Sequence, residues 1–536
     1  MKKGFIFITI TTLAAHFAFS WMGFCPTDDG LNQAFSRRIL EGQVPHRDFI
    51  DLYPIGSALL HAPFVFFGGD RTFWISRLFV WFQFACIAWA WTTVMIRSLK
   101  GLWPAPQKIL LALIAFMFTS NLHPVMAWYT IDGLFFLSLG LVLCLEETPR
   151  GKPLGYALMG VAYLCKQSYL PAVLAFPFIL GDWRRPRLWL AAATPGILYA
   201  AYLLFAGALP DGVFQLSVRA NEFFPRGVKT YLLQSSIPWG ILLGYFAMRL
   251  SFGQTKRQKS LGAILLYGIP FAFSMALSLS FPMAWRLSFG LFGTALGATG
   301  YLILQNKGRT DLARAGMLAL LTGWSVSLSN GCNNPALAAG PLAILLVAYC
   351  HRAYQPADEK NTIRKLPRYL LNALLIVSVA SYGIARQKYI YRDRPAAELT
   401  KALDGLFPGT RLIKTNPNTY EFLVDFKEAV EKTKGLDFAV IPGLPAYWVK
   451  SSQKNPLPLD WVTLWGEMAN KRALIDRVLR DLDKYHGKIV VLLQKVEADH
   501  VADGFTPLPL PGGEIQRYVR AHFTKRGETR FFELYQ

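Results

Sequence analysis

Charged side chains are scarce in this chain. Lys, Arg, Asp and Glu make up 17% of its 536 residues, whereas a soluble globular protein of this length carries about 25%. Hydrophobic residues reach 53%, and the mean hydropathy is +0.29. This composition excludes an ordinary soluble domain and indicates repeated membrane-spanning segments.

Motifs that commonly mark a catalytic site are also missing. The six cysteines lie in or beside apolar segments and show no metal-ligand spacing. Residues 387–536 contain neither a Gly-rich phosphate loop nor a nucleophile turn of the Gly-x-Ser-x-Gly type. Functional residues therefore have to be sought among isolated charges at the membrane boundary, where a charge is costly unless it serves a purpose.

Apolar stretches predict a polytopic α-helical membrane protein with about 13 transmembrane helices. The stretches run over residues 4–24, 72–97, 108–122, 128–145, 153–166, 168–181, 188–207, 235–250, 261–281, 286–304, 313–329, 335–350 and 368–386. Between them, strongly basic connections alternate with connections in which bases and acids nearly balance. By the positive-inside rule, the N-terminus is cytoplasmic and Asp28 lies outside. We therefore expect an integral multi-pass protein of the inner or plasma membrane.

The formal net charge of +22 follows from these cytoplasmic basic clusters, and it does not indicate nucleic acid as a partner. Residues 387–536 differ from the rest because charges recur regularly and element types alternate. Strands are expected at 411–414, 438–442 and 488–494, and amphipathic helices at 420–434 and 469–485. An odd number of spans places this segment outside. We expect an extracytoplasmic α/β domain that is accessory to a catalytic transmembrane domain of residues 1–386.

The first outer loop, residues 25–71, is more than a connector. Asp28 and Asp29 precede a short amphipathic helix at 31–40, and a second apolar stretch at 57–67 suits a helix lying in the membrane interface. An acidic pair at this boundary is a candidate site. The alternative is that Asp28 only caps the following helix.

This loop resembles that of GT-C glycosyltransferases, most closely the family 39 type, which includes protein O-mannosyltransferases and lipid A aminoarabinose transferases. The similarity rests on Asp28-Asp29-Gly30, Arg38 to Pro45, Arg47-Asp48-Phe49 and Tyr53-Pro54-Ile55-Gly56, with further matches at Arg77, Asp132 and Leu164-Cys165-Lys166-Gln167. It covers residues 1–350 in architecture and 1–180 in motif. Lipid A transferases carry a lysine before Pro-Pro where this chain has Tyr53-Pro54-Ile55, which argues against aminoarabinose transfer to lipid A.

The resemblance implies an enzyme that moves a sugar from a polyprenyl-phosphate donor to an extracytoplasmic lipid, glycan or protein acceptor, with inversion. Asp28 matches the family's catalytic aspartate and Asp29 its acidic neighbour. Partial burial would raise the pKa of Asp28 above the ordinary value of about 3.9 and make it a better base. No cofactor is required, although Asp28 and Asp48 could share a divalent cation, since hard cations favour carboxylates.

Bases on the outer side are candidates for binding the donor phosphate. They are Lys166, Arg219, Arg226, Lys229 and Arg286. Lys166 is the strongest of them, because it lies between two short apolar helices. For each base the alternative is a snorkelling side chain at the interface. The candidate residues of the substrate cleft are Arg47, Asp48, Tyr53, His61 and Asp132.

Two other functions fit a polytopic chain. A lipid or oligosaccharide transporter or flippase should show related halves and ionisable or broken helices near the midplane, and the sequence has no such repeat. An enzyme of the O-antigen ligase type carries its large outer loop between late helices, whereas this chain elaborates its first loop and its C-terminal segment.

Overall fold

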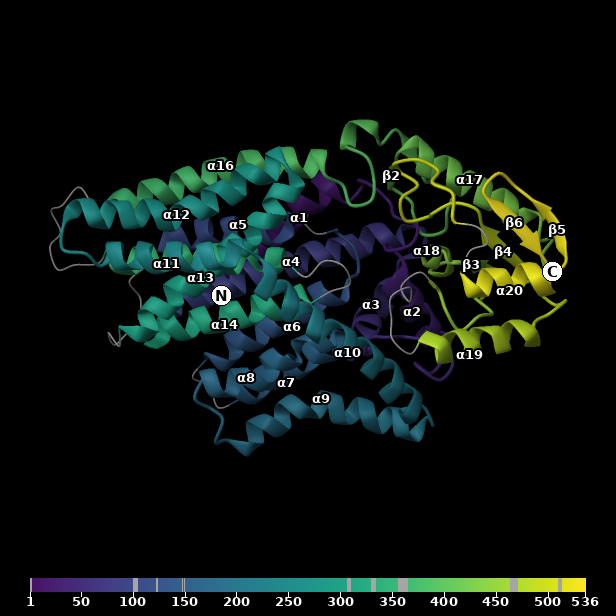
Figure 1. The fold of residues 1–536 in the computed structure, drawn as a ribbon, viewed down its shortest axis with the longest axis horizontal. Coiled ribbons are helices and arrows are strands. Elements are labelled where there is room, and N and C mark those ends of the chain that lie inside the picture. The colour runs from purple at the N-terminus through teal and green to yellow at the C-terminus, as the bar shows by residue number, and fades with distance from the viewer. Residues whose placement is uncertain are drawn as a thin grey trace.

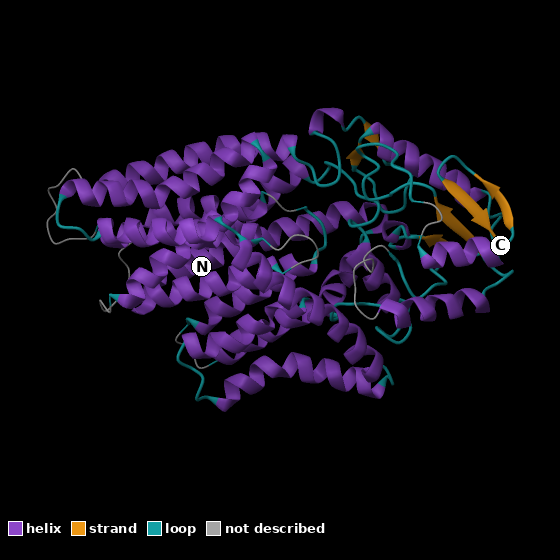
Figure 2. Cartoon of the chain, viewed as in Figure 1, coloured by secondary structure: helices purple, strands orange, loops and turns teal. Residues whose placement is uncertain are grey.

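The computed structural model describes residues 2–99, 105–121, 124–146, 148, 150–305, 310–328, 334–354, 365–462, 471–509 and 513–536. A long helical bundle fills the left of Figure 1, and a smaller unit of helices and strands lies against its right-hand end. Figure 2 shows that the strands are confined to this end. The described part of the chain is therefore a predominantly helical protein with a small sheet region near its C-terminus.

The bundle is formed by α1 and, after the first loop, by the helices from α4 to α16. They are α1 (Lys2–Phe19), α4 (Thr72–Ser98), α5 (Ala105–Ser120), α6 (Tyr129–Cys144), α7 (Gly151–Cys165), α8 (Leu170–Ile179), α9 (Pro186–Phe205), α10 (Leu209–Leu233), α11 (Ser236–Ser251), α12 (Lys256–Leu279), α13 (Phe281–Leu304), α14 (Thr310–Ser327), α15 (Ala339–Ala353) and α16 (Leu366–Lys388). Short 3₁₀ turns at Gly69–Arg71, Gln167–Tyr169 and Pro335–Ala338 lead into α4, α8 and α15.

Six of the described helical segments are long and apolar enough to cross a membrane. They are Gly69–Ser98, Pro186–Phe205, Lys256–Leu279, Phe281–Leu304, Pro335–Ala353 and Leu366–Lys388. The prediction of thirteen spans is therefore wrong in number. Several predicted spans form shorter helices, since α6 has 16 residues, α7 has 15 and α8 has 10, whereas about 20 residues are needed to cross 30 Å of hydrocarbon. Hydropathy alone does not reveal where a helix ends.

Part of the bundle surface is apolar. In α9, Phe205 is 89% exposed, and Ile197 and Leu198 are exposed as well. In contrast, α15 is almost wholly buried at the centre of the bundle. Both kinds of helix are expected in a membrane protein, in which apolar side chains face outwards as well as inwards.

The two helices predicted in the first loop are confirmed as α2 (Leu31–Leu40) and α3 (Gly56–Phe67). Gly30, which precedes α2, allows a close approach, because a Cβ there would lie 2.1 Å from the Cα of Ala446. Next to it, the Ala446 amide donates a hydrogen bond to the Pro26 carbonyl. Phe24 and Phe73 also belong to the hydrophobic core of the C-terminal unit. The first loop and the C-terminal unit therefore pack as one body.

The C-terminal unit contains a four-stranded sheet in the order β3-β4-β6-β5, in which β3 and β4 are parallel and the other pairs antiparallel. Its elements are a 3₁₀ turn at Ala396–Glu398, β1 (Lys401–Ala402), β2 (Lys414–Thr415), α17 (Pro417–Glu431), β3 (Phe438–Ile441), α18 (Pro445–Trp448), α19 (Lys471–Lys484), β4 (Val490–Gln494), α20 (Glu514–His522), β5 (Lys525–Glu528) and β6 (Phe532–Tyr535). Two predicted strands and both predicted helices are confirmed to within a few residues. The hairpin of β5 and β6 was not predicted.

Candidate functional site

Asp29 is a buried carboxylate that holds the turn between α1 and α2. Its Oδ2 accepts a hydrogen bond from the Cys25 amide at 2.8 Å, and its Oδ1 lies 3.1 Å from the Arg77 guanidinium. Arg77, in the first turns of α4, also donates to carbonyl oxygens just after α1, those of Ser20, Met22 and Gly23. These contacts hold the backbone of the turn between α1 and α2 in place.

Asp28 has a different environment from its neighbour. Its side chain is 16% exposed, its Oδ2 accepts a hydrogen bond from the Tyr391 hydroxyl at 2.7 Å, and the same oxygen lies 2.9 Å from the Arg392 guanidinium. The residue that caps α2 is Gly30, without a side-chain hydrogen bond. The alternative that Asp28 serves as the helix cap therefore does not hold. Its partners come instead from the linker that follows α16.

Burial raises the pKa of the Asp28 carboxyl. The cation of Arg392 and the hydrogen bond from Tyr391 oppose this effect, whereas the negative charges of Asp499 and Asp29 add to it. The resulting pKa lies above the ordinary value. A carboxylate with a raised pKa accepts a proton more readily, which suits a general base.

A cavity of about 500 Å³, here called the Arg386 cavity, adjoins this carboxylate. Tyr391 and Arg392, which hold Asp28, form part of its wall. Among the described residues, its wall contains the bases Arg77, Arg386, Lys388 and Arg392 and the carboxylates Asp29 and Asp393. Aromatic side chains complete the wall, those of Phe19, Phe281, Trp285, Tyr389 and Tyr391. Bases thus exceed acids in an otherwise aromatic cavity.

Three side chains show how this cavity could hold an anion. Arg386, in the last turn of α16, has its guanidinium 5.1 Å from the centre of the Trp81 ring. Lys388 has no ion pair with a described carboxylate, and its Nζ lies 3.4 Å from the Leu279 carbonyl oxygen. The Asn121 amide is buried and has no hydrogen-bond partner among the described residues. Cationic and amide donors that face one cavity can bind phosphate oxygens.

Tyr53 and Lys166 lie together in a separate buried cluster. The Tyr53 and Tyr129 rings stack with their centres 3.9 Å apart, and the Tyr53 hydroxyl donates to that of Tyr129. The Lys166 ammonium donates to the Thr130 hydroxyl at 2.9 Å and lies 5.3 Å from the centre of the Tyr129 ring. Lys166 occupies the break between α7 and the following 3₁₀ turn, as its predicted place between two short helices requires.

His61 and Asp132 form another buried network, among α3, α4 and α6. Asp132 accepts hydrogen bonds from the Ser57 hydroxyl at 2.7 Å and from the Gln83 amide at 2.7 Å, and its Oδ1 lies 3.1 Å from His61 Nε2. Both side chains are completely buried. This arrangement joins three helices, and neither His61 nor Asp132 is among the described residues that line the Arg386 cavity.

Arg47 and Asp48 are paired on an exposed turn. Arg47 Nε lies 2.8 Å from Asp48 Oδ1, and Asp48 also accepts a hydrogen bond from the Val44 amide. Arg477 of α19 holds this turn by donating to the His46 carbonyl. Asp28 and Asp48 therefore have separate partners, and the described residues contain no group of three or more His, Cys, Asp or Glu that could hold a metal ion.

The remaining predicted bases lie on two helices. The segment after α9, predicted as a loop, is the 25-residue helix α10, which carries Arg219, Arg226 and Lys229. The side chain of Arg219 lies outside the described residues, Arg226 is half-buried, and Lys229 is exposed. Arg286 is exposed on α13, one residue after Trp285, which lines the Arg386 cavity.

Sequence reasoning missed the residues that surround Asp28. Arg386 is the last residue of the final predicted span, and Lys388 and Arg392 follow it on the side expected to be outside. Bases there run against the positive-inside trend, and this signal could have identified them. Asp499 and Tyr391 carried no such signal, because nothing in the chain order shows that they meet Asp28.

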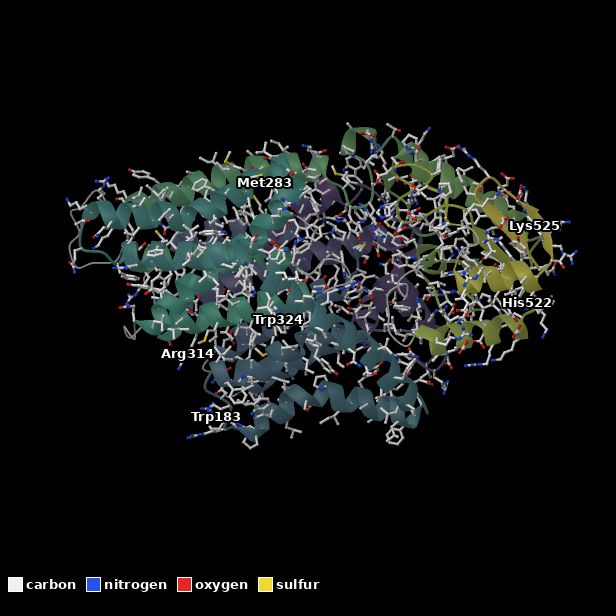
Figure 3. All side chains as sticks on the ribbon, viewed as in Figure 1. Trp183, Met283, Arg314, Trp324, His522 and Lys525 are labelled. Carbon is white, nitrogen blue, oxygen red and sulfur yellow. The ribbon has the colours of Figure 1, made fainter. Side chains whose placement is uncertain are left out.

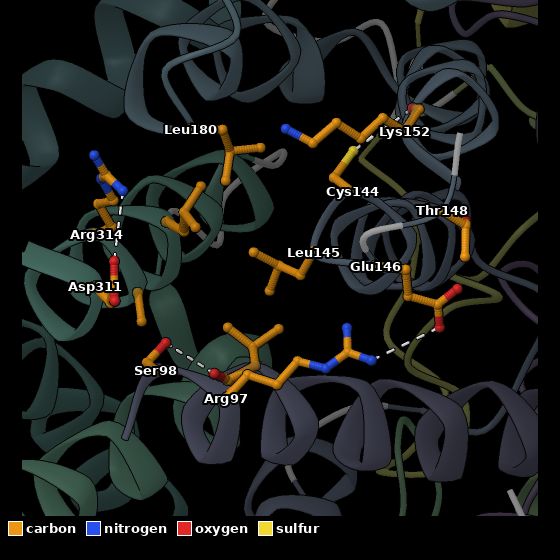
Figure 4. A pocket seen from close by; sticks show the side chains of 13 residues that line it. Arg97, Ser98, Cys144, Leu145, Glu146, Thr148, Lys152, Leu180, Asp311 and Arg314 are labelled. Carbon is orange, nitrogen blue, oxygen red and sulfur yellow. Dashed lines mark hydrogen bonds and ion pairs between the residues drawn. The ribbon is translucent and has the colours of Figure 1, made fainter. Parts of the chain in front are cut away.

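A second cavity lies at the opposite end of the helices, with a volume of about 650 Å³, and is here called the Arg97 cavity (Figure 4). It is lined by the ends of α4, α6 and α8 and the starts of α7 and α14. Each base in its wall faces a carboxylate, in the pairs Arg97–Glu146 at 3.8 Å, Lys152–Asp182 at 2.8 Å and Arg314–Asp311 at 3.5 Å. Each base in the wall of this cavity is thus paired with an acid.

Comparison with known proteins finds nothing similar. No protein-family model, no curated protein and no solved structure matches the chain. The function has to be inferred from the residues of the site, of which Asp28 and the Arg386 cavity are the most informative.

Proposed function

We propose that this chain is an integral-membrane glycosyltransferase that moves a sugar from a polyprenyl-phosphate donor to a hydroxyl of an acceptor outside the cytoplasm. The observation that carries this proposal is the juxtaposition of Asp28 with the Arg386 cavity, where a carboxylate of raised pKa adjoins an excess of bases. In this proposal the N-terminus is cytoplasmic, and both the Arg386 cavity and the C-terminal unit lie on the opposite side.

The Arg386 cavity suits the phosphate end of a lipid-linked donor. Its volume falls within the range of about 300–1,000 Å³ that is common for small-molecule sites. Arg386, Lys388 and the Asn121 amide offer donors for phosphate oxygens. Exposed apolar side chains adjoin its wall at the end of α12 and the start of α13, where Figure 3 labels Met283. This surface would accommodate the first isoprene units of the donor.

The chemistry would proceed as a single displacement. The Asp28 carboxylate takes the proton of the acceptor hydroxyl while the acceptor oxygen forms a bond to the anomeric carbon. The bond between that carbon and the phosphate oxygen breaks on the opposite face, and its electron pair leaves with the polyprenyl phosphate. The configuration at the anomeric carbon inverts, and the bases of the Arg386 cavity stabilise the charge that develops on the leaving phosphate.

The Tyr391 hydroxyl supports the assignment of Asp28 as the base. It donates a hydrogen bond to Asp28 Oδ2 at 2.7 Å, which is the contact that an acceptor hydroxyl must make before its proton is removed. In the proposed reaction the acceptor hydroxyl replaces this phenol. Binding of the acceptor thus requires the linker to shift at Tyr391.

The test is transfer of radiolabelled sugar from polyprenyl-phosphate donors by the purified protein in lipid. Removing a general base lowers a rate by roughly 10²–10⁴-fold, so Asp28→Asn should reduce transfer at least a hundredfold. Asp311→Asn, in the Arg97 cavity, serves as the matched control and should stay within twofold of the wild type. Full activity of Asp28→Asn would refute the base assignment, and movement of a lipid across the bilayer without sugar transfer would favour the transporter.

A further inference from the structure

Arg392 lies between two carboxylates that are far apart in the sequence. Its guanidinium is 2.9 Å from Asp28 in the first loop and 3.3 Å from Asp499 in the C-terminal unit. Both ion pairs use the same nitrogen atom, Nη1. One cation is therefore shared by a carboxylate of the proposed site and a carboxylate of the C-terminal unit.

The backbone and the neighbouring rings hold Arg392 in this position. Its φ angle of 49° lies in the left-handed region, which residues other than glycine rarely adopt. The guanidinium lies 5.4 Å from the centre of the Tyr391 ring and 5.9 Å from that of Trp461. The next residue, Asp393, is tied to the start of the C-terminal unit, because it accepts hydrogen bonds from Thr415 and Asn416. Strained backbone of this kind persists where the surroundings over-determine it, which is common at functional sites.

We infer that Arg392 is a positioning residue for the proposed transfer, and that Asp499 makes the C-terminal unit part of the site by competing with Asp28 for this guanidinium. The inference rests on the proposed function. The C-terminal unit was expected to be only accessory. Here its Asp499 carboxylate acts on the proposed base, Asp28.

Competition between the two carboxylates has a defined effect on the base. An arginine bound to Asp28 alone would hold it as a strongly paired anion and weaken it as a proton acceptor. Asp499 draws the cation away and adds its own negative charge, so Asp28 remains available to an acceptor hydroxyl. The other titratable groups that face Asp28 are Asp29, Cys25 and Tyr391, with Arg77 behind Asp29. His500 stands beside Asp499 at 3.8 Å and also lines the Arg386 cavity.

Two substitutions should move the pH profile of transfer in opposite directions. Without the negative charge in Asp499→Asn, Arg392 stabilises the ionised form of Asp28 more strongly, which lowers the pKa of Asp28. The acid limb of the rate then shifts to lower pH, and the plateau rate falls about three- to tenfold because a weaker base transfers protons more slowly. Arg392→Gln removes the cation and shifts the acid limb to higher pH, whereas Arg392→Lys, which keeps the charge, should restore most of the wild-type profile.

The matched control is Asp503→Asn. Asp503 forms a similar ion pair with Arg394 of the same linker, at 3.3 Å, but it does not contact Asp28. This variant should keep the wild-type profile and rate within twofold. Shifts of the same sign in Asp499→Asn and Arg392→Gln, or an unchanged profile in both, would overturn the inference while leaving the proposed function intact. Absence of transfer in the wild type with every polyprenyl-phosphate donor would overturn both together.

Discussion

Two cavities with differently paired charges lie near the two ends of α4. Arg77, near the start of this helix, belongs to the Arg386 cavity, and Arg97, twenty residues later, belongs to the Arg97 cavity. At 1.5 Å per residue the two positions are about 30 Å apart, close to the thickness of the hydrocarbon core of a membrane. The spacing of the two cavities along α4 is thus close to the thickness of the hydrocarbon core.

They differ in how their charges are compensated. Around Arg97 the Arg97–Glu146 and Arg314–Asp311 pairs are long and exposed, with Arg97 and Glu146 40% and 38% exposed, whereas Lys152 binds the buried Asp182 at 2.8 Å. Around Arg386 the Arg77–Asp29 pair is buried, with both side chains less than a tenth exposed. Exposed pairs contribute little to stability, whereas a buried charge that loses its partner is strongly destabilising. The exposed Arg97–Glu146 pair can therefore be lost at little cost in stability. The buried Arg77–Asp29 pair, in contrast, is part of the structural framework of the Arg386 cavity.

The largest effect should come from breaking that framework. Asp29→Asn leaves the Arg77 guanidinium buried among carbonyl oxygens without its anion, and it should lower the free energy of unfolding by about 3–4 kcal/mol. Glu146→Gln is the control at the other cavity and should change it by less than about 1 kcal/mol. Denaturation of both variants in detergent micelles, with the wild type alongside, measures the difference. Equal losses of stability in the two variants would show that the buried pair is no more important for folding than the exposed one.

A smaller effect is expected at Asp51, a buried carboxylate of the first loop that has no ion pair among the described residues. Burial raises its pKa to about 8, whereas an unfolded chain would give about 3.9. Between these values the unfolded state releases the proton and the folded state keeps it, so stability decreases as the pH rises from about 4 to 8 and then levels off.

Asp51→Asn imitates the protonated acid and should remove this dependence. Its amide oxygen can still accept the hydrogen bond from the Tyr53 backbone. The variant should be more stable than the wild type by about 2 kcal/mol at pH 5.5 and nearly equal to it near pH 4. Unfolding curves recorded at both values provide the measurement. An advantage that stays constant with pH would show that the Asp51 carboxyl does not titrate in this range.

The smallest effect concerns phosphate binding. Lys388→Gln removes one cation from the Arg386 cavity and should weaken binding of polyprenyl phosphate about three- to tenfold, since one exposed charge-assisted contact is worth roughly 1 kcal/mol. Arg314→Gln, in the Arg97 cavity, should leave binding unchanged. Competition against a labelled polyprenyl phosphate in micelles measures both. Equal weakening by the two variants would indicate a general effect of net charge and would argue against a phosphate site in the Arg386 cavity.

Much of the first loop follows from its own sequence. The apolar spacing of residues 31–40 and 57–67 predicts α2 and α3, and both form, because local periodicity determines a short amphipathic helix. The number of spans does not follow in the same way. Hydropathy shows that residues 153–181 are apolar, but it does not show that α7 stops at Cys165 and that Lys166 turns into the protein to meet Thr130.

Within the candidate site, the sequence located the acidic pair but did not distinguish its members. Asp28 and Asp29 are the same residue type at adjacent positions, and both are costly at a membrane edge. Their roles separate only through residues that arrive from elsewhere, Arg77 for Asp29 and Tyr391 with Arg392 for Asp28. Predicted bases such as Lys166 and Lys229 do not line the Arg386 cavity. The order of charges along the chain does not show how far apart two helices lie in the folded protein.

Composition, apolar runs and local periodicity by themselves determined a helical chain suited to a membrane, a first loop with two helices and an acidic pair, and a C-terminal α/β unit. These properties depend on neighbours within a few residues or on averages over about twenty. The tertiary structure alone decided that the C-terminal unit packs on the first loop and that Arg392 joins Asp28 to Asp499. Contacts between residues hundreds of positions apart depend on how the helices pack, and short-range patterns contain no record of that packing.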